Sequence, residues 1–337
     1  MVGFLRPGVL RAGLAWAGLV IAGLVWTGQV QAAPLTEIGS IPLGEVKGAI
    51  ADLGIDYANQ RLFVIEPGEG ALAVVNLAGA KIGQTITGLA EPRGLARAPT
   101  DNRLYVSTSA GKLMIYAGAP LKPEGSVDVG ANPGLLYYDA GSERIYLDLA
   151  GRKIAIIDST HNKHWDNIRL DAEPGAMALE DGGSRIFVAA LGEPRILVAD
   201  RDGNKQTGSW STGANGSAAS IALDEDGGRL LAAFRQPAVL AWFDLADGTL
   251  KGSIPACTEP GQLISDSFRH RAYLTCADGK IQVFTRDAAG AYADIGSVPT
   301  EKGAIKAVLV PTSGRLYLGV PAEGSHGAEI RVYAPAG

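Results

Sequence analysis

The chain is poor in the residues that most often carry out chemistry. Its 337 residues include two cysteines, four histidines and three methionines, and only 19% are charged. It has no run of three Lys or Arg residues and a formal net charge of −5, which argues against a nucleic-acid-binding surface. It also lacks the motifs CxxC, CxxCH, GxSxG and HExxH. Their absence disfavours a thioredoxin-type redox pair, c-type haem attachment, a hydrolase nucleophile elbow and a zincin site.

Long apolar runs are confined to the N-terminal region. Residues 1–32 contain no acid and two bases, Arg6 and Arg11, and a mostly apolar stretch follows at residues 12–26. Small or β-branched residues precede Ala33, so the pattern predicts a secretory signal peptide cleaved after Ala32. With no paired arginine and no nearby cysteine, Sec export is favoured over Tat export or a lipid anchor. An uncleaved anchor is the alternative, although the apolar run is shorter than the ~20 residues of a membrane span.

Export sets further expectations for residues 33–337, which we predict to form a single domain. Without the signal peptide the chain has 28 basic and 35 acidic residues, a net charge of −7. We therefore expect an acidic, monomeric protein of the periplasm or secreted medium, with no membrane or nucleic-acid contact. Cys257 and Cys276, 19 residues apart, are compatible with one disulfide that would stabilise the fold by about 3 kcal/mol.

A short motif recurs along the whole of this region. It consists of a basic residue, an aliphatic residue, usually an aromatic residue and another aliphatic residue. We call its first residue the anchor arginine, and the seven copies are Arg61, Arg103, Arg144, Arg185, Arg229, Arg271 and Arg315. Their spacings are 42, 41, 41, 44, 42 and 44 residues, which indicates a repeat architecture.

Each repeat carries four strand signals. An apolar run with an Asp/Gly/Asn/Ser turn precedes the motif, and an alternating strand such as KIAIID or RILVAD follows it, before a weaker fourth strand such as GSVDV. Four short strands in about 42 residues are typical of a β-propeller blade. The sequence therefore predicts an all-β, seven-bladed propeller with four antiparallel strands per blade.

The two ends of this region are predicted to complete one blade together. The last repeat stops after its third strand, EIRVYA, and the string LTEIGSIPLG near residue 36 resembles YADIGSVPTEKG at residues 292–303. Residues 36–42 should therefore pair with residues 329–334 as the fourth strand of the seventh blade. Such closure leaves no unpaired sheet edge in the ring.

Strings such as GSRIFVAALGEPRILVAD and TDNRLYVSTSAGKLMIYA resemble the exported 40-residue YVTN β-propeller repeat family. The resemblance covers nearly all of residues 33–337. It implies a bacterial periplasmic or secreted binding or accessory protein, but it does not imply one activity.

Histidines offer one candidate metal site. His161 and His164 are spaced i, i+3 in a turn, with Asp158 and Asp166 nearby, and could hold a divalent metal in a periplasmic metal carrier. Solvated loop histidines are the more common case. No other cofactor is expected.

An enzyme is a second alternative. The predicted innermost strands offer Asp52, Tyr137, Glu180 and Asp224 as polar groups, but no histidine. Propeller lactonases, lyases and accessory chains of quinoprotein dehydrogenases would need an acid pair or a metal at the channel mouth. We therefore lean towards a non-catalytic protein.

The favoured site lies on the loops that lead into the innermost strands. The residue before Gly in these loops is basic at Lys47, Arg93 and Lys302, in blades that neighbour one another in a closed ring. This sector could attract a small anionic ligand or a partner protein. The acids Glu301, Glu45 and Glu91 could neutralise this sector instead. The acids included with the candidate binding site are Glu91, Glu173 and Glu259.

Overall fold

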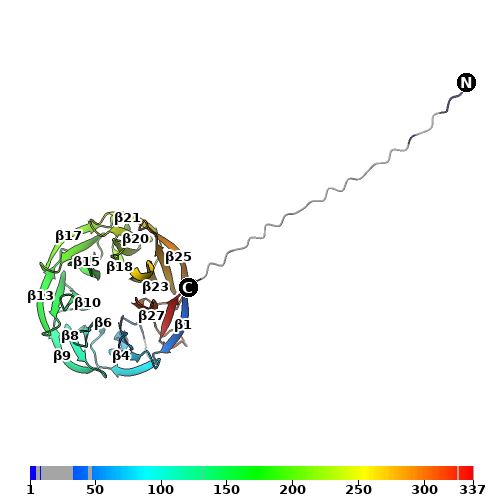
Figure 1. Ribbon diagram of the computed structural model, residues 1–337. Coiled ribbons are helices and arrows are strands. Elements are labelled where there is room, and N and C mark those ends of the chain that lie inside the picture. Colours follow the sequence, from blue (N-terminus) through cyan, green and yellow to red (C-terminus); the bar gives the residue numbers. More distant parts are fainter. Residues whose placement is uncertain (5–7, 9–32, 45–47, 131, 325, 337) are drawn as a thin grey trace. The chain divides into compact units, whose positions relative to one another are not determined.

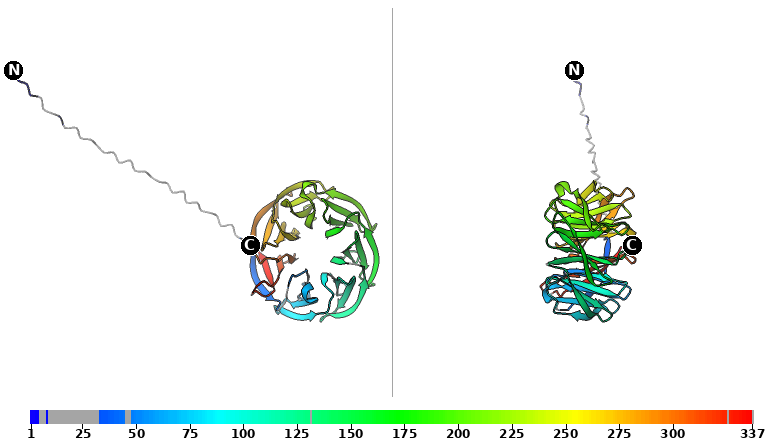
Figure 2. Two further views of the ribbon diagram at one scale, coloured as in Figure 1. Left: turned by 180° about the vertical axis from the view of Figure 1, so that it is seen from behind. Right: turned by 90° about the vertical axis from the view of Figure 1, so that its left-hand side faces the viewer.

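The repeat forms seven four-stranded antiparallel sheets in the computed structural model of the chain. The structure describes residues 1–4, 8, 33–44, 48–130, 132–324 and 326–336. The chain divides after Ala32 into two units, and most of the predicted signal peptide lies outside the described residues. In the second unit the sheets surround a central opening as blades, seen face-on in Figure 1 and edge-on in the right-hand view of Figure 2.

Blades I to IV follow one another along the chain, each with its innermost strand first. Blade I comprises β2 (Asp52–Asp56), β3 (Arg61–Glu66), β4 (Ala71–Asn76) and β5 (Lys81–Ile86). Blade II comprises β6 (Pro92–Ala98), β7 (Arg103–Thr108), β8 (Lys112–Ala117) and β9 (Lys122–Asp128). Blade III comprises β10 (Pro133–Asp139), β11 (Arg144–Leu149), β12 (Lys153–Asp158) and β13 (Lys163–Arg169). Blade IV comprises β14 (Pro174–Leu179), β15 (Arg185–Ala190), β16 (Arg195–Asp200) and β17 (Lys205–Ser211).

The remaining blades close the ring. Blade V comprises β18 (Ala218–Asp224), β19 (Arg229–Arg235), β20 (Ala238–Asp244) and β21 (Leu250–Pro255). Blade VI comprises β22 (Pro260–Asp266), β23 (Arg271–Cys276), β24 (Lys280–Arg286) and β25 (Tyr292–Pro299). Blade VII comprises β26 (Lys306–Val310), β27 (Arg315–Val320), β28 (Glu329–Pro335) and, from the other end of the chain, β1 (Leu35–Pro42). The pairing of β1 with β28 confirms the predicted closure. In the part of the chain that the structure describes, three short 3-10 helices lie in turns: η1 (Pro67–Glu69), η2 (Gly213–Asn215) and η3 (Ser267–Arg269).

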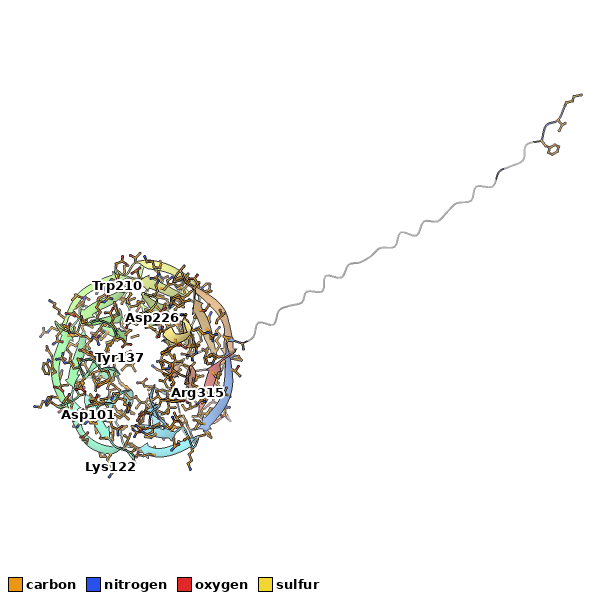
Figure 3. The ribbon with its side chains drawn as sticks, viewed as in Figure 1. Asp101, Lys122, Tyr137, Trp210, Asp226 and Arg315 are labelled. Atoms are coloured by element: carbon orange, nitrogen blue, oxygen red, sulfur yellow. A yellow bond between two sulfur atoms is a disulfide. The ribbon has the colours of Figure 1, made fainter. Side chains whose placement is uncertain are left out.

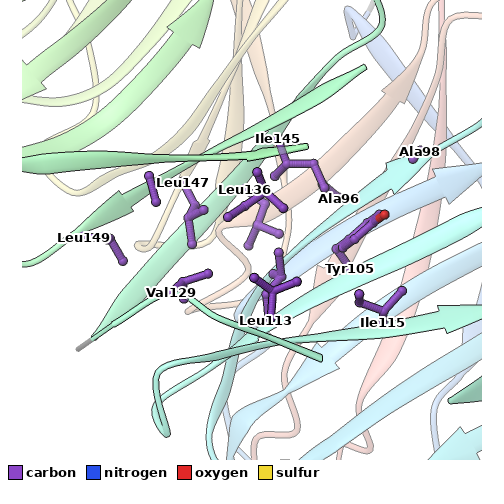
Figure 4. Close-up of a cluster of buried hydrophobic side chains, with 13 residues drawn as sticks. Ala96, Ala98, Tyr105, Leu113, Ile115, Val129, Leu136, Ile145, Leu147 and Leu149 are labelled. Carbon is purple, nitrogen blue, oxygen red and sulfur yellow. The ribbon is translucent and has the colours of Figure 1, made fainter. Parts of the chain in front are cut away.

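The hydrophobic core is divided among the interfaces between adjacent blades, which we call seams. The second and third strands of a blade have neighbours on both faces, so their motifs are apolar almost throughout, whereas the fourth strand is largely exposed. The described residues form seven buried clusters, and each cluster spans one seam. Figure 4 shows the cluster between blades II and III, to which Leu113 and Ile115 of blade II and Leu136 and Ile145 of blade III belong.

The anchor arginines help to join the blades. Four of them donate to a backbone carbonyl in the next blade: Arg61 to Gly118 (2.8 Å), Arg103 to Ser159 (3.2 Å), Arg185 to Leu245 (2.7 Å) and Arg271 to Pro34 (3.2 Å). The recurrence of the basic residue therefore has a structural explanation, because it supplies a charge-assisted hydrogen bond across the seam.

The two faces of the ring carry loops that connect different pairs of strands. One face, here the mouth face, carries the loops that lead into the innermost strands, such as residues 87–91, and the turns between second and third strands, such as residues 109–111. The opposite back face carries the remaining turns, such as residues 99–102 and 118–121. Among the described residues, no helix is long and apolar enough to cross a membrane.

Candidate functional site

The mouth face brings the predicted basic sector together only in part. Lys47 lies outside the described residues. Lys302 is exposed on the loop that leads into β26, as predicted, whereas Arg93 is the second residue of β6 rather than part of the loop before it. The Arg93 guanidinium donates to the Asn132 side chain and lies 3.9 Å from the Glu91 carboxylate. Glu91 is 70% exposed, so this ion pair neutralises Arg93 only weakly.

The other acids of the predicted site have local partners. Glu301, which could have neutralised Lys302, pairs instead with Arg331 at 2.8 Å. Glu173 accepts hydrogen bonds from the backbone amides of Gly151 and Arg152, at 3.1 and 3.2 Å, and so fixes a neighbouring turn. Glu259 lies 3.9 Å from Arg235. The positions of Glu173 and Glu259 are thus explained by loop structure.

A cavity of about 310 Å³ occupies the central channel. In each blade, one residue of the innermost strand lies opposite the anchor arginine of the second strand. The residue four positions before it occupies the same height along the channel in every blade. We call these seven the channel ring: Asp52, Gly94, Leu135, Ala176, Ser220, Gln262 and Lys306. All but Gly94 line the cavity. The polar members form an arc across blades V, VI, VII and I, and small or apolar members form the opposite arc.

Most polar side chains of the channel hold the next blade in place. Asp52 accepts from the Leu95 amide, Ser220 from the Leu263 amide and Gln262 from the Ala307 amide, each at 3.0 Å. Tyr137, which faces the central opening in Figure 3, accepts from the Met177 amide at 3.3 Å. These groups satisfy backbone donors that would otherwise lack partners, so their positions have a structural cause.

Lys306 is the exception in the channel ring. Among the described residues, no acceptor lies within hydrogen-bond or ion-pair distance of its ammonium group. The ammonium group nevertheless interacts electrostatically with Asp52. Burial raises the pKa of Asp52 to about 6, against the opposing effects of Lys306 and of the Leu95 and Leu53 amides. The cavity wall therefore carries a cation without a direct partner and an acid that is half-protonated near pH 6.

A second acid behind the channel is perturbed in the same way. Burial raises the pKa of Asp148 to about 6, although hydrogen bonds from the Leu135 and Asp148 amides and the charge of Arg93 oppose the shift. The sequence analysis did not single out Lys306, Gln262, Ser220 or Asp148. Alignment of the repeats on the anchor arginine could have found Lys306 and Asp148, because Lys306 is the only basic residue at its position of the repeat and Asp148 is the only charged residue at its own.

The four polar residues predicted on the innermost strands lie in two different places. Asp52 and Tyr137 line the channel cavity. Glu180 instead forms an ion pair with Arg185 at 2.5 Å, and Asp224 pairs with Arg286 at 2.6 Å, both near the back face. Glu180 and Asp224 are therefore explained by structural ion pairs.

The histidine pair does not converge on one point. His161 is bonded through Nδ1 to Asp158 at 2.8 Å. His164, which lies on β13 rather than in the turn before it, is bonded through Nε2 to the Asp166 carbonyl and the Asn167 side chain. Across the described residues, no group of three or more His, Cys, Asp and Glu side chains could hold a metal ion. A metal at His161 and His164 thus stays an untested prediction.

Cys257 and Cys276 are joined in a disulfide, with Cα atoms 6.2 Å apart. Cys257 lies on the loop that leads into β22, and Cys276 ends β23, so the bond holds one loop of the mouth face to its blade. Both residues are buried.

The buried Glu66 carboxylate gives the mouth face a pH dependence. Glu66 is 3% exposed, and its Oε1 has no hydrogen-bond partner among the described residues. Burial, and secondarily the charge of Glu69, raise its pKa from 4.5 to about 7. The folded state therefore holds a proton that the unfolded state releases, so stability is lost as the pH rises from about 4.5 towards 7.

Glu66→Gln should raise the free energy of unfolding by about 2 kcal/mol at pH 8 and leave it nearly unchanged at pH 4.5. Glutamine imitates the protonated form, so it removes the cost of a buried charge. Urea denaturation at the two pH values measures the effect, and Glu69→Gln at the exposed neighbour is the control, with a much smaller gain. Equal stability of Glu66→Gln and wild type at pH 8 would contradict the assignment.

Solved structures share the fold of this chain. The crystal structure of the RRP9 WD40 repeats matches with a TM-score of 0.75 at 11% identity, over 89% of this chain and 100% of that chain. In fold, the protein is a seven-bladed β-propeller. The crystal structure of Raptor from Chaetomium thermophilum matches with a TM-score of 0.74 at 14% identity, over 89% of this chain. This propeller spans only 29% of that Raptor chain.

Identities this low show the fold alone. No family model matches the chain, and no curated protein sequence matches it. The resemblance of this propeller to the YVTN repeat family therefore rests on the repeat strings themselves.

Proposed function

We propose that this propeller is a non-catalytic binding protein that captures the carboxylate group of a small organic anion at its mouth face. One observation carries the proposal: the Lys306 ammonium lines a 310 Å³ cavity, and none of the residues that the structure describes forms a direct ion pair with it. Lys306 is half-buried, and a partly desolvated cation without a direct ion pair is stabilised when an anionic ligand pairs with it. Lys302, on the loop that leads into β26, and Arg93, near the start of β6 in blade II, would raise the local concentration of anions at the mouth face.

The size and lining of the cavity support a small ligand rather than a flat protein surface. A volume of 310 Å³ lies at the lower end of small-molecule sites. Leu53, Leu95, Leu136 and Met177 line the cavity together with the polar arc. An organic acid with a compact apolar body matches both halves of this wall.

We place this binding protein in the periplasm or the secreted medium. The composition of residues 1–32 supports export, and the disulfide between Cys257 and Cys276 is of the kind that persists in an oxidising compartment. A small organic anion would then be bound outside the cytoplasm.

Lys306→Gln is expected to weaken binding of small carboxylates at least tenfold. Benzoate, malate and citrate are the probes, and isothermal titration calorimetry at low ionic strength measures their affinity. Lys280→Gln is the matched control, because Lys280 already pairs with Asp278 at 3.1 Å. Binding should also strengthen from pH 7.5 to pH 5.5, because protonation of Asp52, whose pKa is about 6, removes the negative charge beside Lys306.

Two outcomes would count against this function. The first is that none of the three probes binds at 10 mM. The second is that a probe binds equally well to wild type and Lys306→Gln, which would place its site elsewhere.

A further inference from the structure

The channel ends at the back face in a groove of about 540 Å³, which we call the back groove. Blades IV, V, VI and VII build it, and it adjoins the channel cavity, since Gln262 and Leu263 line both. Its apolar wall includes Leu179, Leu223 and Ile264, which are all half-buried. The groove therefore exposes apolar surface at the end of the channel that lies opposite the mouth face.

Apolar residues also occupy the turns beside the back groove. Pro311, in a turn of blade VII, lines the groove and is exposed, and the Arg269 guanidinium donates to its carbonyl at 2.9 Å and so holds that turn. Phe268 follows the groove residue Ser267 in η3 and is 69% exposed. A groove bordered by exposed proline and phenylalanine offers more apolar surface than a small molecule covers, which favours a protein segment as the occupant.

The rim of the back groove is acidic. Of the described residues that line it, three are acids, Asp181, Glu225 and Asp226, and none is basic. None of these acids forms an ion pair within the described part of the chain. Figure 3 shows Asp226 on the inner side of the ring. The apolar wall is therefore combined with negative charge that no side chain neutralises directly.

Two of these acids lie close together. The Glu225 carboxylate accepts from the Asp181 and Gly182 amides, at 2.5 and 3.0 Å, and so joins the turns of blades IV and V. Burial, and secondarily the charge of Glu225, raise the pKa of Asp181. Arg201 opposes this shift, but it is buried and already pairs with Asp139 at 2.8 Å. A bound cation would relieve the repulsion between the two carboxylates.

We propose that the back groove binds a basic segment of a partner protein, in which an aromatic or long aliphatic side chain lies between two Lys or Arg residues. The apolar side chain packs against Leu179, Leu223 and Ile264. The flanking cations pair with Asp181 and Asp226. Acidic segments are rejected, because binding would bring like charges together. The groove is at the opposite end of the channel from the carboxylate site, and its occupation does not depend on that site.

The peptide acetyl-Gly-Lys-Phe-Lys-Gly-amide is the probe for this proposal. Its blocked ends carry no carboxylate to pair with Lys306, so failure of this probe is distinct from failure of the proposed function. Isothermal titration calorimetry at low ionic strength should show saturable binding. Two further peptides, with Ser in place of Phe or with Glu in place of both Lys residues, should bind at least tenfold more weakly, because each lacks one of the complementary features.

Asp181→Asn/Asp226→Asn should weaken binding of the Lys-Phe-Lys peptide at least tenfold, since both cations lose their partners. Asp128→Asn/Glu37→Gln is the matched control, because it changes the net charge equally at exposed positions of the outer strands β9 and β1. It should leave peptide affinity unchanged. All four side chains are exposed, so both double variants should keep the wild-type melting temperature.

Four results would overturn the proposal. The Lys-Phe-Lys peptide does not bind at about 5 mM, the Lys-Ser-Lys peptide binds as tightly, or the two double variants bind the peptide equally well. The fourth is that benzylamine binds as tightly as the peptide, because the occupant would then be a small organic cation rather than a protein segment.

Discussion

Replacement of Leu35 by Asp is expected to lower the free energy of unfolding by about 4 kcal/mol. Leu35 begins β1, is 1% exposed, and belongs to the cluster in the seam between blades VI and VII, with Tyr273 and Tyr333. The substitution removes apolar contacts there and places a carboxylate in an apolar site. Because β1 is the strand that completes blade VII, the damage also weakens ring closure.

Ile38→Asp is the control on the same strand. Ile38 is 50% exposed and lies at an irregularity in the pairing of β1 with β28, so its replacement should change stability by less than about 0.5 kcal/mol. Chemical denaturation followed by circular dichroism compares the two variants. A similar effect of both would mean that β1 is not held in the ring as described.

The fold could be predicted because its main signals are local. The strand alternation, the turn residues and the anchor motif recur in each blade, so seven weak signals at a regular spacing supported one another. Closure was predictable because the β1 string resembles the β25 string, and both form the fourth strand of their blades. The role of the anchor arginines was not predictable, since their acceptors lie in the next blade, more than 50 residues away for Arg61 and Arg103.

The candidate sites were less accessible to sequence reasoning. The sequence of the entry loops pointed to Arg93 and Lys302. Lys306 is the first residue of β26, four residues after Lys302, and only the register of that strand shows that it faces the channel. The channel site lies where one repeat departs from the others, and such departures are where function is most expected.

The seam between blades V and VI provides the second large effect. Asp224→Ala is expected to lower the free energy of unfolding by about 3–5 kcal/mol. Asp224 is 3% exposed, lies 2.6 Å from the Arg286 guanidinium and accepts a hydrogen bond from the Tyr292 hydroxyl. Its removal leaves the charge of Arg286 in a largely buried position and Tyr292 without its acceptor.

Two further variants separate the loss of this ion pair from a general loss of acidic residues. Asp244→Ala removes a carboxylate of the same blade that pairs with Lys251 at 3.2 Å on the surface, so it should cost far less. The double variant Asp224→Ala/Arg286→Met should recover much of the stability, because it also removes the uncompensated charge. If the double variant is no more stable than Asp224→Ala, the cost comes from lost packing at this seam, and the ion pair is not its cause.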